Sequence, residues 1–340
     1  MLAGIYKGSR QFELVDYSLR KIEPQELLVK VEYCGICGTD FHIVQGKAPS
    51  KPPVILGHEY SGRIVEKDKS TNGFNIDDLV VINPNIHCGY CDYCKEGKVN
   101  HCKNLKALGV TQNGGFSQYS IVPASQVYRL PDDFSLQSAA FAEPLSCCIH
   151  GIKKASIKLG DKIAILGGGP IGLLMLQLTQ LVGASEILII EPSHQKRKLA
   201  TVIGADYVLD SRDSNLIEKV LDLTCGGVDV VIECVGKSDA AWTSLQIVKE
   251  GGTVLLFGLA EQSSTISLKL QSFFHREISI RSSLLNPFTF QTAVDFLVSG
   301  KISVEQFNSV QVSFRNEELV SLFNNSKNSS VVKYMVTPNN

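Results

Sequence analysis

Four cysteines lie within fifteen residues, at Cys88, Cys91, Cys94 and Cys102. Thiolates at this spacing can close one tetrahedral metal shell, and zinc is the natural occupant because it is borderline-soft and has no redox chemistry of its own. Since cysteine would fill every coordination position, the metal would be structural and would hold a loop together. Catalytic chemistry is therefore expected elsewhere in the chain.

A second set of metal ligands is spread along the chain in three separate segments. Cys37, His58 and Glu143 would offer sulfur, imidazole and carboxylate, a three-ligand zinc site that leaves one position open for water. That open position is what a catalytic metal needs. Glu59, directly after His58, is a further candidate, either as a direct ligand or behind the ligands, and the sequence does not decide between Glu59 and Glu143.

A glycine-rich turn follows the apolar run at 163–166 and opens a predicted helix that ends near residue 183. The turn contains Gly167, Gly169 and Gly172, with Pro170 and Ile171 between the last two glycines. The first glycine permits a tight turn, the second lets a pyrophosphate approach the backbone, and the third lets helix and strand pack closely. This context favours a dinucleotide-binding site.

An acidic residue, Glu191, ends the next predicted strand, where its carboxylate can accept hydrogen bonds from both ribose hydroxyls of an adenosine. The same charge would repel a 2′-phosphate, so NAD is favoured over NADP, although Lys196 and Arg197 lie close behind. Val235 and Gly236 end the fourth predicted strand, at the carboxyl edge where such sheets bind ligands.

Composition limits the class of protein. The chain has 340 residues, of which 44% are hydrophobic, so it can form the cores of two domains of ordinary size. Its net charge of −1 does not provide the positive field of a nucleic-acid-binding protein. No apolar run is long enough to span a membrane and the amino terminus lacks a signal peptide, so we expect a cytoplasmic protein. The other cysteines, Cys34, Cys147, Cys148, Cys225 and Cys234, are expected to be core thiols without disulfides.

The elements that position these residues fall into two classes. Short β-type runs separated by Gly, Pro and Asn fill the first 145 residues, whereas from about 160 apolar strands alternate with amphipathic helices. We predict a β-rich domain at 1–150, a doubly wound parallel sheet at 151–286, and a return to the first domain at 287–340. The Asn/Ser-rich stretch at 324–330 is predicted to be a loop.

Several of these motifs occur together in the order typical of one family. They are GHE near 58, the cysteine lobe at 88–102, GGFSQY at 114–119, AEPLSCCIHG at 142–151 and the glycine turn at 167–172. In this combination the chain resembles the zinc-containing medium-chain dehydrogenases, and the acid in AEP resembles their polyol branch of sorbitol (iditol), arabinitol and galactitol-phosphate dehydrogenases. The resemblance implies an α/β protein with a GroES-like catalytic domain and a Rossmann domain.

By the same resemblance, the catalytic zinc falls on Cys37, His58 and Glu143, with Glu59 variably assigned, and the structural zinc falls on the four-cysteine lobe. Thr39 would take the alcohol proton and pass it through the nicotinamide ribose to His42. The metal would acidify an alcohol, and its hydride would pass to NAD.

Other activities stay open. Within the class they are oxidation of a polyol phosphate, of threonine or of another alcohol, and outside it a nucleotide-binding zinc scaffold without catalysis. The partners we expect are a small alcohol substrate and a second copy of the chain, in a homodimer or homotetramer. No nucleic-acid or membrane partner is expected. The apolar strand at 253–258, near the sheet edge, is a candidate for subunit contact.

Overall fold

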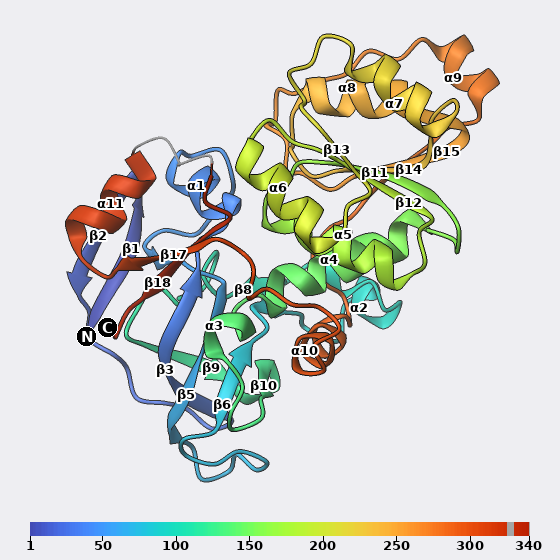
Figure 1. Ribbon diagram of the computed structural model, residues 1–340. Helices are drawn as coiled ribbons and strands as arrows, with labels where there is room; N and C mark the ends of the chain where they lie inside the picture. Colours follow the sequence, from blue (N-terminus) through green and yellow to red (C-terminus); the bar gives the residue numbers. More distant parts are fainter. Residues whose placement is uncertain (325–329, 340) are drawn as a thin grey trace. The chain divides into compact units, whose positions relative to one another are not determined.

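The computed structural model describes residues 1–324 and 330–339, and its chain divides into two compact units (Figure 1). Unit 1 comprises Met1–Ser146 and Leu285–Asn340, and unit 2 comprises Cys147–Leu284. The sequence placed the corresponding borders at 150 and 286. Residues 325–329, which form most of the predicted Asn/Ser-rich loop, lie outside the described residues.

Unit 1 is built mainly from antiparallel strands. Its largest sheet runs in the order β10 (Val127–Arg129), β6 (Leu79–Ile82), β5 (Glu59–Lys67), β3 (Glu26–Gly35), β18 (Lys333–Thr337) and β17 (Ser309–Ser313), and β9 (Tyr119–Pro123) also pairs with β3. The smaller sheets are formed by β2 (Gln11–Asp16), β1 (Leu2–Gly8) and β4 (Val54–Ile55), and by β7 (Asn85–Ile86) with β8 (Lys106–Ala107). The last strands of the chain thus lie beside the first ones.

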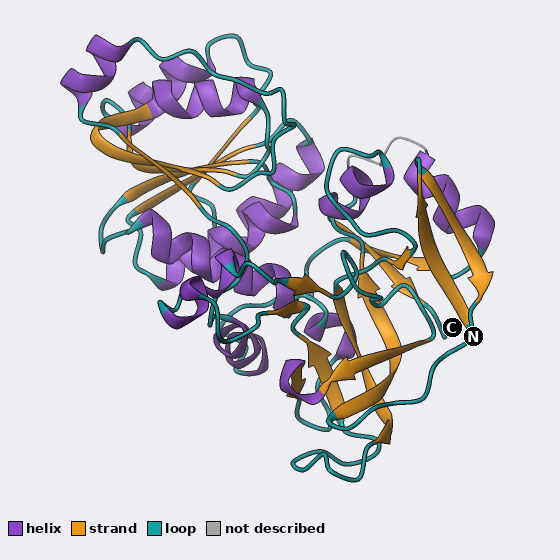
Figure 2. Ribbon diagram, turned by 180° about the vertical axis from the view of Figure 1, so that it is seen from behind, coloured by secondary structure: helices purple, strands orange, loops and turns teal. Residues whose placement is uncertain are grey.

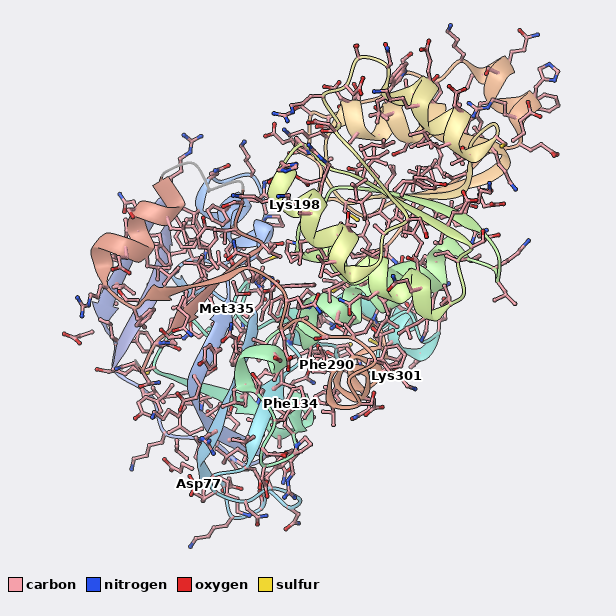
Figure 3. All side chains as sticks on the ribbon, viewed as in Figure 1. Asp77, Phe134, Lys198, Phe290, Lys301 and Met335 are labelled. Carbon is pink, nitrogen blue, oxygen red and sulfur yellow. The ribbon has the colours of Figure 1, made fainter. Side chains whose placement is uncertain are left out.

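Alternating side chains give β3 its place in the sheet. Leu27, Val29 and Val31 are fully buried on one face, while the residues between them are partly exposed, which is the period-two pattern of a half-buried strand. The short helices of this unit are α1 (Gly38–Val44), α2 (Asp92–Lys95), α3 (Leu136–Ala139), α10 (Phe290–Val298) and α11 (Asn316–Asn324). Phe290, labelled in Figure 3, packs against Tyr128 of β10 with ring centroids 4.7 Å apart.

Unit 2 is a six-stranded parallel sheet with helices on both faces (Figures 1 and 2). The strand order is β13 (Tyr207–Leu209), β12 (Glu186–Ile190), β11 (Lys162–Leu166), β14 (Val228–Glu233), β15 (Val248–Leu256) and β16 (Ser279–Ser282). The helices are α4 (Ala142–Ala155), which begins in unit 1, α5 (Pro170–Leu181), α6 (His194–Ile203), α7 (Leu216–Thr224), α8 (Ser238–Ile247) and α9 (Leu270–Arg276). This is the 3-2-1-4-5-6 order of a dinucleotide-binding fold, with its switch point between β11 and β14.

The structure corrects two details of the sequence interpretation. Residues 253–256 of the apolar run at 253–258 lie in β15, which pairs with β14 and with β16, so this run is one strand in from the edge, and the edge strands among the described residues are β13 and β16. Cys225 is exposed, not in the core, because it occupies the left-handed position after α7 with φ of 55°. Within the described ranges 1–324 and 330–339, none of the helices combines the length and apolar character needed to cross a bilayer.

Candidate active site and metal centres

Sheet register brings three potential metal ligands of unit 1 together. Cys37 follows β3 as the N-cap of α1, and His58 and Glu59 stand at the start of β5, which pairs with β3 through Gly35 and Glu59. One ligand atom from each of Cys37, His58 and Glu59 lies within 4.8 Å of the other two. Ligands of one zinc ion lie about 3–4 Å apart, so small side-chain rotations would close this group on a metal.

Glu143 does not belong to this group. It is buried in the first turn of α4, and among the described residues the metal-ligand group contains Glu59 and not Glu143. The geometry therefore favours Glu59 of the two carboxylates that the sequence left open, and Glu143 stays a candidate for a ligand or for a group that borders the site.

Asp40 stands behind the histidine and is fully buried. Its Oδ1 lies 3.4 Å from Nδ1 of His58, and its Oδ2 accepts a hydrogen bond of 2.8 Å from the backbone N–H of Cys37. Burial lowers the pKa of His58, but the charges of Asp40 and Cys37 more than offset this, so the pKa is raised well above its ordinary value. Asp40 thus orients one ligand and fixes the backbone of another.

The two proposed proton carriers lie on the same short helix. Thr39 places its Oγ1 at 3.6 Å from Sγ of Cys37, so the hydroxyl is next to the ligand group. His42 is half-buried in the last turn of α1. The structure therefore puts Thr39 against a ligand and His42 one helical turn away.

A buried lysine at this site was not found from the sequence. Lys333, the first residue of β18, forms an ion pair with Oε2 of Glu59, and the two side chains are 4% and 2% exposed. Burial lowers the pKa of Lys333, but Glu59 and Cys37 raise it by more, so the ammonium stays charged. The sequence does contain a sign of this burial, because Lys333 is the one charged residue in the apolar run Val331–Val336.

The four-cysteine lobe has the dimensions of a metal site. The Sγ atom of Cys91 lies 3.5 Å from Sγ of Cys94 and 4.0 Å from Sγ of Cys102, and the Sγ atoms of Cys88 and Cys94 are 3.9 Å apart. Four sulfurs placed tetrahedrally about 2.3 Å from one zinc ion would be separated by about 3.8 Å. The thiols thus fit a closed, structural zinc site.

The lobe also contains backbone donors that stabilise thiolates. Burial raises the pKa of Cys88, but the backbone N–H groups of Tyr90 and Cys91 lower it by more, to about 6. The backbone N–H groups of Cys88 and Asn104 lie 3.3 Å and 3.4 Å from Sγ of Cys102. Such contacts favour the charged sulfur that a metal requires.

In unit 2 the glycine turn has the geometry of a phosphate cradle. Gly167 adopts φ of 103°, which strains any other residue, and a Cβ at Gly172 would collide with the carbonyl oxygen of Gly167. A Cβ at Gly169 would meet no atom of the described residues within 4 Å. Gly169 caps α5 and Pro170 and Ile171 begin it, so the helix N-terminus faces open space, and no side chain of the N-cap residue covers its first-turn N–H groups.

Glu191 follows β12 and reaches this turn. Its Oε2 accepts a hydrogen bond of 2.7 Å from Gly168 N–H, and its Oε1 accepts one of 2.9 Å from Ser193 N–H. Arg197, the nearest guanidinium in sequence, donates to the Glu191 carbonyl and lies 3.1 Å from Asp210. The acid is thus fixed at the turn, and the arginine is held by other acceptors.

Val235 and Gly236 follow β14 at the same edge of the sheet. Their N–H groups donate to Oε1 of Glu233, at 2.6 Å and 2.8 Å, which folds this loop back over the strand end. Gly236 has φ of 73°. Glu233 was not among the residues predicted from the sequence, because its contacts are with backbone N–H groups and leave no pattern of side-chain types.

Comparisons with known proteins agree with this arrangement. The model of the alcohol dehydrogenase GroES-like domain matches residues 23–132, and that of the zinc-binding dehydrogenase domain matches 170–299. D-arabitol-phosphate dehydrogenase of Enterococcus avium is 36% identical over 88% of this chain and 86% of its own length. Sorbitol dehydrogenase of Halalkalibacterium halodurans is 34% identical over 92% of each chain.

A solved structure extends the similarity to the whole fold. A protein of Sinorhizobium meliloti, assigned to the zinc-binding dehydrogenases and crystallised with NADP, superposes with a TM-score of 0.95. It is 36% identical, and the match covers 99% of each chain. The predicted GroES-like and Rossmann folds are thereby confirmed, and this chain is an oxidoreductase that belongs to the zinc-containing medium-chain dehydrogenases, in their polyol dehydrogenase branch.

Proposed function

We propose that this protein transfers a hydride between NAD and a polyol or another secondary alcohol, with zinc at Cys37, His58 and Glu59. The observation that carries the proposal is the convergence of these three side chains in a chain whose relatives are named for sorbitol and arabitol phosphate. Zinc would supply a Lewis acid that makes a hydroxyl more acidic, and NAD would accept the hydride.

The protein's own groups would hold and move the proton. Thr39, 3.6 Å from the Cys37 sulfur, would accept the alcohol proton and give up its own hydroxyl proton, which would pass through the nicotinamide ribose to His42, on the next turn of α1, and from there to solvent. Asp40 would keep His58 oriented as a ligand. Glu143 is kept as an alternative or occasional ligand.

NAD is the cofactor that the charges at the β12 end favour. Glu191 presents a buried carboxylate beside the turn, where a 2′-phosphate would meet a negative charge. Arg197, which would have to bind that phosphate, is already engaged by Asp210. The Sinorhizobium relative was crystallised with NADP, so titration with both cofactors tests this preference.

The proposal includes a cytoplasmic homodimer or homotetramer. The free edge of β16 supports self-association, and so do Leu270 and Phe274 on α9, which are 77% and 76% exposed. Light scattering of the purified protein would measure the number of subunits directly.

The test of the activity is a screen of polyols, polyol phosphates, threonine and simple alcohols with NAD and NADP, followed by the absorbance of reduced nicotinamide. We expect turnover of a polyol with NAD, loss of turnover after chelation of the accessible metal, and recovery with zinc. Unchanged turnover after verified metal loss would refute the metal's role. Silence with every substrate, in protein shown to bind NAD, would support a non-catalytic scaffold.

A polyol phosphate is the second candidate, because the relative from Enterococcus avium acts, by its name, on arabitol phosphate. The cation that the structure places against the ligand group, Lys333, is buried in its pair with Glu59 and is not presented to a substrate phosphate. We therefore rank the unphosphorylated alcohol first. Comparing kcat/KM for a polyol and its phosphate ester decides between them.

A further inference from the structure

Three neighbouring strands of unit 1 create a contact that the proposed mechanism does not use. On one side of β3, Gly35 pairs with Glu59 of β5, and on the other side it pairs with Met335 of β18, which Figure 3 labels. Lys333 lies two residues before Met335 and therefore on the same face of β18. The register thus sets Lys333 and Glu59 on either side of Gly35.

The contact is an ion pair out of reach of water. Lys333 and Glu59 are 4% and 2% exposed, and the ammonium lies 5.9 Å from the ring centroid of Phe141. A lysine is rarely buried so completely, because the loss of hydration is large unless a counter-charge compensates it. Here the counter-charge is a carboxylate that also belongs to the metal-ligand group.

Gly35 provides the space for this pair. A Cβ at Gly35 would collide with Oε2 of Glu59 and would lie 2.7 Å from Cε of Lys333. Its φ is not among the positive values of the chain, so the backbone conformation does not require glycine there. The residue type at 35 is explained by the room that the two charged side chains take up.

We propose that Lys333 is a positioning residue that competes with the metal ion for the carboxylate of Glu59. The inference rests on the proposed metal site at Cys37, His58 and Glu59. A carboxylate that is pulled toward the ammonium donates less to the metal, so a coordination position stays available for substrate. Without the ammonium, the buried negative charge of Glu59 has the metal as its remaining partner. Glu59 would then bind the metal through both carboxylate oxygens, and the second oxygen would take the position left for substrate.

The test compares Lys333→Met, which keeps the length and removes the charge, with Lys333→Arg, which keeps the charge. Metal affinity is measured by competition between a chelator and the full-length protein for Zn²⁺. The coordination number is read from the absorption bands of protein loaded with Co²⁺ at this site. For Lys333→Met we expect affinity to rise roughly 10- to 100-fold, the range for changes beside metal ligands, together with an altered Co²⁺ spectrum and lower kcat. Lys333→Arg is expected to keep the Co²⁺ spectrum of the wild-type protein.

A double variant separates competition from simple packing. In Glu59→Gln the neutral amide is a poor metal ligand, so adding Lys333→Met to it should leave the metal affinity unchanged. If Lys333→Met folds and its affinity and spectrum match wild type, or if its affinity falls, the competition is refuted. If Lys333→Met does not fold, the comparison of Lys333→Arg and Lys333→Gln gives the same decision.

The metal site itself is tested by a separate count. Wild-type protein should hold two metal ions per chain and Cys37→Ser one. A single ion in the wild type would refute the proposed function. With two ions in the wild type, an unaltered Lys333→Met would refute the role of Lys333 alone.

Discussion

The carboxylate of Glu191, at the end of β12, accepts a hydrogen bond of 2.7 Å from the backbone N–H of Gly168, in the turn that follows β11. One side chain therefore connects the two strand ends where a dinucleotide would lie. Its charge and its hydrogen bond have different consequences, and two substitutions separate them.

Glu191→Gln keeps an acceptor for Gly168 and removes the charge. We expect NAD affinity to fall about 10- to 100-fold, because hydrogen bonds to charged groups contribute about 1.5–3 kcal/mol, and NADP affinity to rise. Glu191→Ala should weaken both cofactors by also loosening the turn. Fluorescence titration measures these affinities, with Glu186→Gln at the other end of β12 as the control. Equal NAD affinity in Glu191→Gln and wild type would contradict the assignment.

Loss of a cysteine from the four-cysteine lobe should lower the stability of the protein without removing a group that takes part in the reaction. Cys102→Ser removes one thiolate from sulfurs that lie 3.5–4.0 Å apart, so the site should release its zinc. We expect one metal ion per chain instead of two and a lower Tm. The destabilisation should be comparable to a lost disulfide, roughly 2–5 kcal/mol. Elemental analysis and calorimetry measure both effects.

The matched control is Cys225→Ser, an exposed thiol after α7, which should change neither metal content nor Tm. If Cys102→Ser keeps two ions and a wild-type Tm, the lobe does not hold a structural metal.

Asp40 should determine how the metal affinity of the site at Cys37, His58 and Glu59 depends on pH. Metal binding needs neutral His58, and the raised pKa of His58 means that protons compete from a higher pH than for an ordinary histidine. Asp40→Asn removes the charge that raises this pKa and keeps an acceptor for Cys37 N–H. We expect metal affinity at neutral or higher pH to fall roughly 10- to 100-fold, and the pH below which the affinity begins to decline to move to a lower value.

Chelator competition across a pH series measures this response. Asp40→Ala should show the same weakening and also lose about 1 kcal/mol of stability, because it removes the cap of α1. If the affinity of Asp40→Asn begins to decline at the same pH as that of wild type, Asp40 does not act on His58.

Local patterns explain what the sequence could predict. The cysteine lobe and the glycine turn are short segments, so a metal site at Cys88 to Cys102 can be predicted from spacing, and a dinucleotide site at Gly167 to Gly172 from spacing together with the strand and helix on either side. Apolar strand runs gave the parallel sheet for the same reason, since burial on both faces of β11 and β12 leaves a continuous hydrophobic stretch.

Contacts across the sheet explain what the sequence could not predict. The pair of Lys333 and Glu59, and the choice of Glu59 over Glu143 for the ligand group, depend on the register of β5, β3 and β18, which no local spacing encodes. Cys225 was expected in the core from its residue type, but a left-handed helix end placed it at the surface. The tendency of a residue type to be buried is a weak guide where the backbone conformation determines which way the side chain points.

The environment of Glu233 predicts how the free energy of unfolding changes with pH. The side chain is 2% exposed, and its Oε1 accepts the N–H groups of Val235 and Gly236. Burial raises the pKa of Glu233, and although the two N–H donors lower it, the net pKa is above the ordinary value of 4.5. The folded protein therefore binds this proton more tightly than the unfolded chain. The stability that Glu233 contributes is complete below about pH 4.5 and is lost as pH rises through the raised pKa.

Glu233→Gln removes this titration, and the amide oxygen can still accept both N–H groups. Relative to wild type, the variant should gain stability steadily from about pH 4 to pH 7, because the cost of the buried charge then appears only in the wild type. Glu233→Ala leaves the buried donors unpaired and should lose about 1–3 kcal/mol at every pH. Urea unfolding across the pH series measures these differences, with exposed Glu250→Gln as the control that should show no trend. A Glu233→Gln variant whose stability relative to wild type falls toward pH 7 would show that the N–H groups need the full charge of the carboxylate.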